Sequence, residues 1–176
     1  MRKVFIFILL LVLPSCSTLK KCTKNQDIIK LTNSNFNLLT GKYIDESWRK
    51  KDSTSCSLSW DIFDKGLSGI DSLKYTEIKV ISSSEIIVQF YDGHSISRSK
   101  VFKGYIKDGY FVLKRKFLVI PAIIFNVFRN RSFRIGLLRN NNIITDYHQI
   151  TFGTDYVFLP IYSIQKDYNI EFIRIK

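Results

Sequence analysis

The sequence predicts an all-β protein that folds as an antiparallel up-and-down meander, and three observations carry this prediction. Short runs rich in β-branched and aromatic residues recur about every ten residues. Clusters of Asp, Gly, Asn and Ser, which form tight turns, stand between these runs. No apolar repeat of helical period separates one run from the next. Because a meander leaves two edge strands, we expect closure into a barrel, with a β-sandwich as the alternative.

Residues 1–15 have the features of an export signal and are expected to lie outside the folded domain. Arg2 and Lys3 precede an unbroken apolar run over residues 4–13, and Pro14 ends this run. A transmembrane helix needs roughly 20 apolar residues, so the run is too short to remain as a span. Residues 13–16, Leu-Pro-Ser-Cys, resemble the lipobox of bacterial lipoproteins.

This resemblance to bacterial lipoproteins implies that Cys16 becomes the lipidated first residue of the mature chain. It implies a diacylglycerol thioether on the sulfur and an acylated amino group, with acyl chains such as palmitate, and two or more chains anchor a protein stably. Ser17 follows the cysteine, which in the better-known sorting scheme favours the outer membrane of the bacterial envelope. The alternative is an ordinary secretory signal that is cut near Ser15 or Ser17 and leaves Cys16 as a thiol.

The mature chain is expected to consist of a tether and one domain. Residues 16–35 are polar and without a sustained period, so we expect a lipidated tether that leads into a short helical turn. Residues 36–176 are enough for a single β-barrel domain with one core. Strands are expected over residues 42–45, 57–63, 75–81, 85–91, 97–107, 110–118, 123–128, 133–139, 143–152, 156–162 and 170–175. Turns are expected at 82–84, 92–93, 108–109, 130–132 and 140–142.

The expected strand at 110–118 gives the clearest assignment of faces. Side chains alternate between the two faces of a strand. One alternating set is apolar and is expected to point inward: Phe111, Leu113 and Phe117. The other set carries Lys114 and Lys116, which are expected to point outward. Arg115 then falls on the inward set, where it reaches a rim or an ion pair, or lies in a cavity, because an unpaired charge in a dry core is too costly.

The run 117–128 is almost entirely apolar, and Pro121 lies in its middle. Proline cannot donate to a strand ladder, so the chain must turn, bulge or lie at an edge there. One interpretation is a pair of strands buried on both faces. The other is an apolar lip that touches lipid or closes over a ligand.

The charge balance is strongly basic, with 27 Lys and Arg against 15 Asp and Glu. The formal net charge of +12 falls to about +10 when Arg2 and Lys3 are removed with the signal. An exported basic protein meets anionic headgroups, lipopolysaccharide phosphates or an acidic partner, unless the excess is simply solvated surface. Basic and aromatic residues also interleave over 98–139, but nucleic acid is not expected in this compartment.

Cys22 and Cys56 remain once Cys16 is lipidated. In an oxidising compartment they form a candidate disulfide, which would stabilise the fold by about 3.5 to 4 kcal/mol on the chain-entropy model. The alternative is two independent thiols.

No motif for catalysis is expected to be functional. The segment 66–69 falls one residue short of a nucleophile elbow. His94 lies in an expected turn, and His148 lies two residues after Asp146, where the two form a candidate pH-sensitive pair. No metal-ligand spacing is present, so we expect no enzyme activity, no metal and no cofactor.

The start of the domain is similar to the entry of a lipocalin-like barrel, with Leu39, Gly41 and Tyr43 in the order of a short helical turn, a Gly, one residue and an aromatic. Tyr43 stands where that family usually has Trp, and Arg174 matches its closing Arg. The resemblance implies an up-and-down barrel that binds apolar molecules. We then expect a lumen lined by Phe111, Leu113 and Phe117, with Arg115 meeting an anionic head.

Two functions compete at this point, and both are non-enzymatic. The first is an anchored binding module for a lipid or a small apolar ligand, which requires a hollow interior. The second is a structural or assembly subunit of the envelope, which has a filled core and binds an envelope protein or an anionic surface through its basic outer face.

Overall fold

A computed structural model describes residues 27–48, 55–63, 74–114, 116–121, 126–155 and 159–175. The all-β prediction is confirmed over these residues. Eleven of the described strands form one antiparallel sheet, and β3 pairs with β4 separately. The expected helical turn is the 3-10 helix η1 (Phe36–Leu39), and the described part of the chain has one α-helix, α2 (Leu58–Phe63). None of the described helices is long and apolar enough to cross a membrane.

The strands follow the chain in order and are mostly joined as hairpins. Their bounds are β1 Ile28–Ile29, β2 Gly41–Ile44, β3 Glu46–Trp48, β4 Ser55–Ser57, β5 Lys74–Ser82, β6 Glu85–Asp92, β7 Ser95–Lys107, β8 Tyr110–Leu113, β9 Lys116–Pro121, β10 Asn126–Leu138, β11 Ile143–Asp155, β12 Leu159–Phe172 and β13 Arg174–Ile175.

The strand order is open, so closure into a barrel is not confirmed. It runs β12-β11-β10-β8-β7-β6-β5-β2-β13, with β1 and β9 as further partners of β10. Most neighbours in this order are also neighbours in the sequence, as expected for a meander. The strands at the two ends of this order, β12 and β13, are consecutive in the chain, since Ile173 alone separates them.

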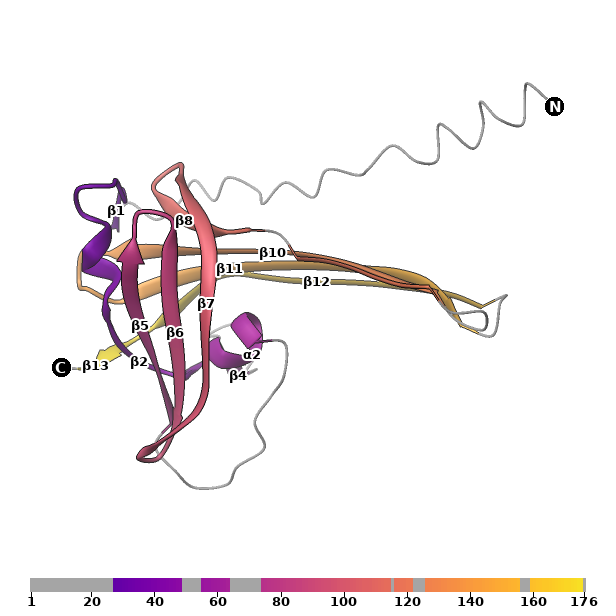
Figure 1. The fold of residues 1–176 in the computed structure, drawn as a ribbon, viewed down its shortest axis with the longest axis horizontal. Helices are drawn as coiled ribbons and strands as arrows, with labels where there is room; N and C mark the ends of the chain where they lie inside the picture. Colours follow the sequence, from indigo (N-terminus) through magenta and orange to yellow (C-terminus); the bar gives the residue numbers. More distant parts are fainter. Residues whose placement is uncertain are drawn as a thin grey trace.

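Two parts of the sheet differ in direction. In Figure 1, β5, β6 and β7 stand across one end of the molecule, whereas β10, β11 and β12 run away from them as a long, narrow extension. The strands β10, β11 and β12 have 13, 13 and 14 residues. Their outer halves project from the body of the protein (Figure 1).

The tight turns follow the turn chemistry of the sequence. Asp108 and Gly109, between β7 and β8, have φ values of 53° and 82°, which two-residue hairpins of this kind require. Asn141 has a φ of 67° between β10 and β11, and Gly93 has a φ of 63° between β6 and β7. Asn and Gly tolerate this left-handed region better than other residues, so these turns were predictable.

The strand expected at 57–63 is wrong, because residues 58–63 form α2. Leu58 and Ile62 lie four residues apart on one side of this helix, and both are buried. The buried Asp45 carboxylate accepts hydrogen bonds from the Ser59 backbone N–H (2.7 Å) and from the Ser57 hydroxyl (2.7 Å). This tertiary contact satisfies the polar groups where the helix begins.

The turn expected at 130–132 is also wrong. Residues 126–138 form one continuous strand, β10, which pairs with β11 along almost its whole length. Residues 159–172 form one strand, β12, which joins the described part of the strand expected at 156–162 to the start of the strand expected at 170–175. Residues 174–175 form β13, and residues 156–158 lie outside the described residues. Conversely, the expected strand at 110–118 is divided into β8 and β9. Long ladders on a neighbouring strand outweigh local turn preference.

The core lies between η1, β1 and the inner faces of the strands. Phe36 and Phe111 pack with their ring centroids 4.8 Å apart, and Phe172 is fully buried whereas Ile173 is exposed. Residues 27–35, which we expected in the tether, contribute β1 and the buried Leu31 to this core. The chain is therefore packed against the sheet from residue 27 onward.

Candidate functional site

The most distinctive surface is the four-stranded extension, which we call the arm. It consists of β9, the first part of β10 (126–131), the last part of β11 (149–155) and the first part of β12 (159–166). β9 pairs with β10, β10 with β11, and β11 with β12, all antiparallel. Figure 1 shows the arm directed away from β5, β6 and β7.

Register aligns apolar residues across the arm. Phe128 is the partner of Phe152, and Phe152 is the partner of Tyr162. In the next row on the same side of the sheet, Ile150 is the partner of Ile164. Paired residues of antiparallel strands share a face. These five residues, Phe128, Ile150, Phe152, Tyr162 and Ile164, are called the arm face.

The arm face is open over much of its area. Phe152 is 54% exposed, Tyr162 is 65% exposed and Ile164 is 41% exposed. The alternate positions on β11 and β12 include Gln149, Thr151, Gly153, Ser163 and Gln165, together with Ile161, which is 37% exposed. The alternate set on β9 and β10 also includes Leu118, Ile120 and Val127. The arm is thus amphipathic along the part of β11 and β12 nearest the body, because a strand with one apolar and one wet face shows this alternation.

Arg131 shows on which side of the sheet the arm face lies. It belongs to the alternate, polar set, it is buried, and its guanidinium donates a hydrogen bond to the Asp61 carbonyl oxygen on α2 (2.5 Å). The same guanidinium lies 5.2 Å from the ring centroid of Tyr147. The polar side of the arm root is therefore packed against α2, and the arm face lies on the opposite side.

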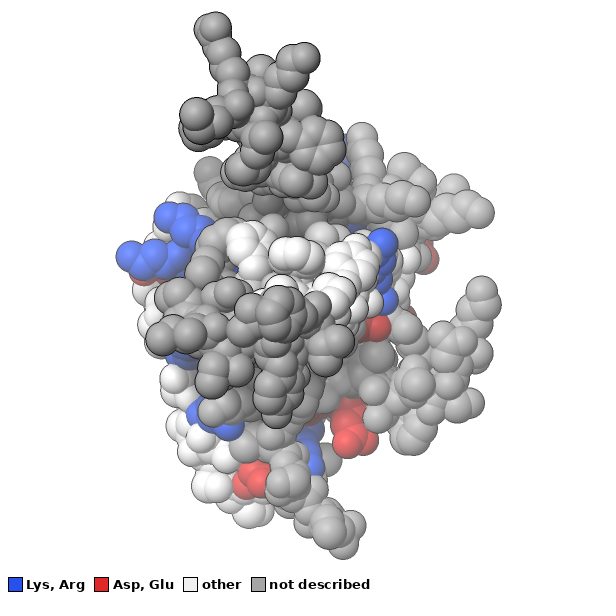
Figure 2. Space-filling model, turned by 90° about the vertical axis from the view of Figure 1, so that its right-hand side faces the viewer, with Lys and Arg blue, Asp and Glu red and all other residues white. Residues whose placement is uncertain are grey.

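The described strands of the arm are basic. They carry Lys116, Arg129, Arg131 and Lys166 against Asp155, which gives a formal charge of four minus one, or +3. Lys166 is exposed and lies two residues from Ile164 on β12. Figure 2 looks at the end of the molecule toward which the arm points, and it shows Lys and Arg on both sides of an uncharged area.

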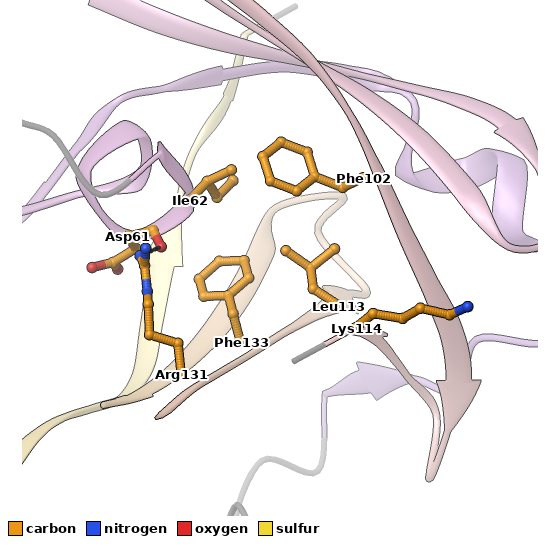
Figure 3. Close-up of a pocket in the computed structure, with 7 residues that line it drawn as sticks. All are labelled: Asp61, Ile62, Phe102, Leu113, Lys114, Arg131 and Phe133. Carbon is orange, nitrogen blue, oxygen red and sulfur yellow. Dashed lines mark hydrogen bonds between the residues drawn. The ribbon is translucent and has the colours of Figure 1, made fainter. Parts of the chain in front are cut away.

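A pocket lies at the root of the arm, between α2 and the sheet. Its apolar lining comes from Ile62, Phe102, Leu113 and Phe133, and its polar lining from Asp61, Lys114 and Arg131. In Figure 3 the four apolar side chains point toward a common space, whereas the Lys114 side chain runs away from it. The cavity volume is about 30 Å³, which is room for about one water molecule.

The structure separates the residues that we expected to line a lumen. Phe111 is fully buried against Phe36, and a Cβ on Gly104 would lie only 2.4 Å from its ring. Leu113 is buried and lines the pocket. Phe117 lies on β9, where it pairs in register with Asn130. Arg115 lies outside the described residues. The inward orientation of Phe111 and Leu113 is confirmed, but Phe111 occupies a filled position.

The cysteines are only partly described. Cys16 and Cys22 lie outside the described residues, and Cys56 lies on β4 with Ser47 as its register partner. Lipidation of Cys16 and a disulfide between Cys22 and Cys56 therefore stay predictions.

Asp146, the candidate partner of His148, forms an ion pair with Arg134. The Arg134 guanidinium donates to the Asp146 carboxylate at 2.6 Å, and both side chains are buried. The backbone N–H of Asn169 donates to the other carboxylate oxygen at 2.7 Å. Arg134 also lies 4.3 Å from the ring centroid of Tyr110. Asp146 thus belongs to a buried ion pair between β10 and β11.

The other histidine, His94, is exposed in the turn between β6 and β7. Across the described ranges, no three His, Cys, Asp or Glu side chains gather in a group that could hold a metal ion.

The residues of the lipocalin-like entry lie together. The Arg174 guanidinium donates to the carbonyl oxygens of Leu38 and Thr40 and lies 5.9 Å from the ring centroid of Tyr43. A Cβ on Gly41 would lie 2.6 Å from Arg174 Nε, so glycine makes room for this side chain. The last strand is thereby fixed to η1 and to the start of β2.

Sequence reasoning missed the arm as a unit. Its signal was present, because the apolar lip at 117–128 and the alternation at 149–154 and 161–165 are both visible in the sequence. Only the register shows that the described parts of these segments, which exclude residues 122–125, join in one sheet.

No protein-family model, no curated protein and no solved structure matches the chain.

Proposed function

We propose that the protein is a lipid-anchored component of the bacterial envelope, held at the outer membrane through Cys16, and that it acts as a non-enzymatic binding module through its outer surface. The observation that carries this proposal is the arm, whose apolar face is open while the core beside Phe111 is filled. An exposed apolar patch on a soluble domain marks an interaction site.

The export signal and the Cys16 lipobox support the membrane location. The matched control for a labelling experiment is Cys22, the next cysteine in the chain. We expect palmitate to label the wild-type protein and the Cys22→Ser variant when they are made in a bacterium, and not to label Cys16→Ser. Equal labelling of Cys16→Ser and wild type would contradict lipid anchoring at this residue.

A lipocalin-like barrel remains our proposal for the finer architecture. It is supported by the meander order and by the contact of Arg174 with Tyr43 and with the carbonyl oxygens that flank Leu39. In this proposal the segment formed by β12 and β13 joins the two ends of the sheet, since β12 pairs with β11 and β13 pairs with β2.

The pocket favours a second candidate function, the carriage of a small amphiphile. Four apolar side chains converge there, and the Arg131 guanidinium lies beside them (Figure 3). A chain-bearing ligand requires the pocket to widen well beyond its volume of about 30 Å³.

Mass spectrometry of an organic extract of the purified protein separates the two functions. A stoichiometric lipid or small apolar molecule, lost in a Leu113→Gln variant that still folds, would establish the carrier. A folded protein with nothing bound supports action through the outer surface.

A further inference from the structure

We propose that the arm face docks on the surface of a lipid bilayer that contains anionic headgroups. This inference rests on the proposed membrane location and names the surface that the module recognises. The arm lies along the bilayer, with the arm face against the acyl chain boundary and the polar set toward water.

The first argument is the amphipathic character of the arm. Phe152, Tyr162 and Ile164 are neighbours across β11 and β12, and Phe152 and Tyr162 are among the most exposed large apolar side chains of the described residues. Antiparallel sheets normally cover their apolar face with another layer. The polar side of the arm root is already covered by α2, which accepts a hydrogen bond from Arg131. The arm face thus requires a cover of a different kind.

The second argument is the kind of side chain on the arm face. Tyr prefers the boundary between headgroups and acyl chains, because its ring is apolar while its hydroxyl can remain in water, and Phe is common on the apolar face of elements that lie in this boundary. Tyr162 has the largest exposed fraction of these residues, 65%, and it lies beside Phe152. Ile150 and Ile164 extend the apolar surface toward the body.

The third argument is charge. The register places Lys166 on the same side of the sheet as the arm face, whereas Lys116, Arg129 and Arg131 fall in the alternate set on the other side. The whole chain carries a formal charge of +12, which attracts it to an anionic surface. Lys166 lies at the end of the arm face nearest the body, where its flexible side chain can reach headgroup phosphates. Asp155 falls at a register position of the alternate, polar set. A second copy of this chain would bring like charges together, whereas an anionic bilayer complements them.

The edge of the arm explains why it lies on the membrane rather than across it. Over 159–165, β12 pairs with β11 alone among the described strands. Its other edge therefore presents backbone N–H and C=O groups that need hydrogen bonds. These groups cannot be left without partners in the acyl core, but water reaches them at the headgroup level.

The test uses the chain without residues 1–16, which keeps every element that the structure describes and has no lipid anchor. Vesicles of phosphatidylethanolamine and phosphatidylglycerol in equal parts are compared with vesicles of phosphatidylcholine alone in a flotation assay. We expect the protein to float with the anionic vesicles and to bind the neutral vesicles roughly tenfold more weakly, with the difference shrinking at high salt.

The variants distinguish the arm face from other exposed apolar residues. The double variant Phe152→Gln and Tyr162→Gln is expected to bind anionic vesicles roughly tenfold more weakly than the unsubstituted chain. The matched control is Tyr105→Gln, because Tyr105 is also about half exposed (48%) but lies on β7. This control is expected to bind normally. Tyr162→Gln alone serves as a milder variant if the double variant does not fold.

Each contrary outcome overturns a defined part of the inference. Unchanged binding by the folded double variant would exclude the arm face. Equal binding to both kinds of vesicle would exclude anionic headgroups. If the chain binds neither vesicle but self-associates through the arm face, the cover is a second copy. Absence of vesicle binding, with palmitate labelling of Cys16 intact, would overturn this inference and leave the proposed anchoring standing.

Discussion

At the scale of single residues, Phe111 distinguishes a packed interior from a hollow one. Its ring is fully buried, contacts Phe36 and leaves no room for a Cβ at Gly104. Gly104 lies on β7 directly opposite Leu113 in the register, so this strand approaches its neighbour closely. The sequence placed Phe111 on the inward face, but alternation alone does not reveal what fills the space beyond the ring.

We expect Phe111→Trp to destabilise the protein by roughly 1–3 kcal/mol, because a larger ring overpacks a filled core. Urea denaturation monitored by circular dichroism measures the change in the free energy of unfolding. Tyr105→Trp is the matched control, since it enlarges a half-exposed aromatic residue on β7. If Phe111→Trp is as stable as the wild type, the interior is hollow at this point and the carrier function gains support.

Tyr43 makes stability sensitive to alkaline pH. Burial raises the pKa of its hydroxyl to about 12, although the nearby Arg174 lowers it in part. The hydroxyl also donates to the Leu39 carbonyl oxygen at 2.9 Å. A raised pKa in the folded state means that the unfolded chain releases this proton first as the pH rises.

The contribution of Tyr43 is therefore complete below pH 10, the usual pKa of tyrosine, and is lost between pH 10 and about 12. We expect this loss to be about 2–3 kcal/mol, measured as the difference in unfolding free energy between neutral and alkaline buffers. In Tyr43→Phe the alkaline loss should shrink by this amount. If wild type and Tyr43→Phe show the same dependence of unfolding free energy on pH, Tyr43 is not the cause of the alkaline loss.

At the scale of elements, β10 and β11 are joined by more than their backbone ladder. The ion pair of Arg134 with Asp146 connects the two strands near the body, and Asn169, with a φ of 57°, donates its N–H to the same carboxylate from β12. Three strands thus meet at Asp146. This polar junction fixes the root from which the arm extends.

We expect Asp146→Ala to destabilise the protein by roughly 3–5 kcal/mol, because it leaves the buried Arg134 without its counter-charge. The double variant Arg134→Met and Asp146→Leu should cost less than Asp146→Ala, since it leaves no buried charge. The stabilities of the two variants are compared by thermal unfolding. A double variant that is less stable than Asp146→Ala would show that the pair itself, rather than the unpaired charge, dominates.

The elements also show how far local sequence signals reach. The turns at 92–93, 108–109 and 140–142 were predictable, because Gly and Asn allow the positive φ values found there. The helix at 58–63 was not predictable, since its six residues are too few to show a period and its start depends on Asp45. Residues 130–132 have the composition of a turn, but pairing with β11 keeps them in a strand.

At the scale of the whole molecule, the chain joins a filled body to a projecting amphipathic sheet. The body includes η1, α2 and the strands around the core, and Arg174 connects the last strand to η1 and to the start of β2. The arm shares β10, β11 and β12 with the body (Figure 1). The proposed lipid anchor and the proposed docking of the arm on the same bilayer would together hold the protein in one orientation at the membrane surface.

The sequence by itself determined the antiparallel all-β class, most of the hairpin turns and the inward faces of Phe111 and Leu113, because these depend on residues close together in the chain. Only the tertiary structure decided the open strand order, the helix at 58–63 and the arm. These features depend on register between segments that are distant in the sequence. The same alternation of apolar residues occurs in strands with a buried face and in strands with an exposed face. The two cases differ only in whether another layer of the protein covers that face.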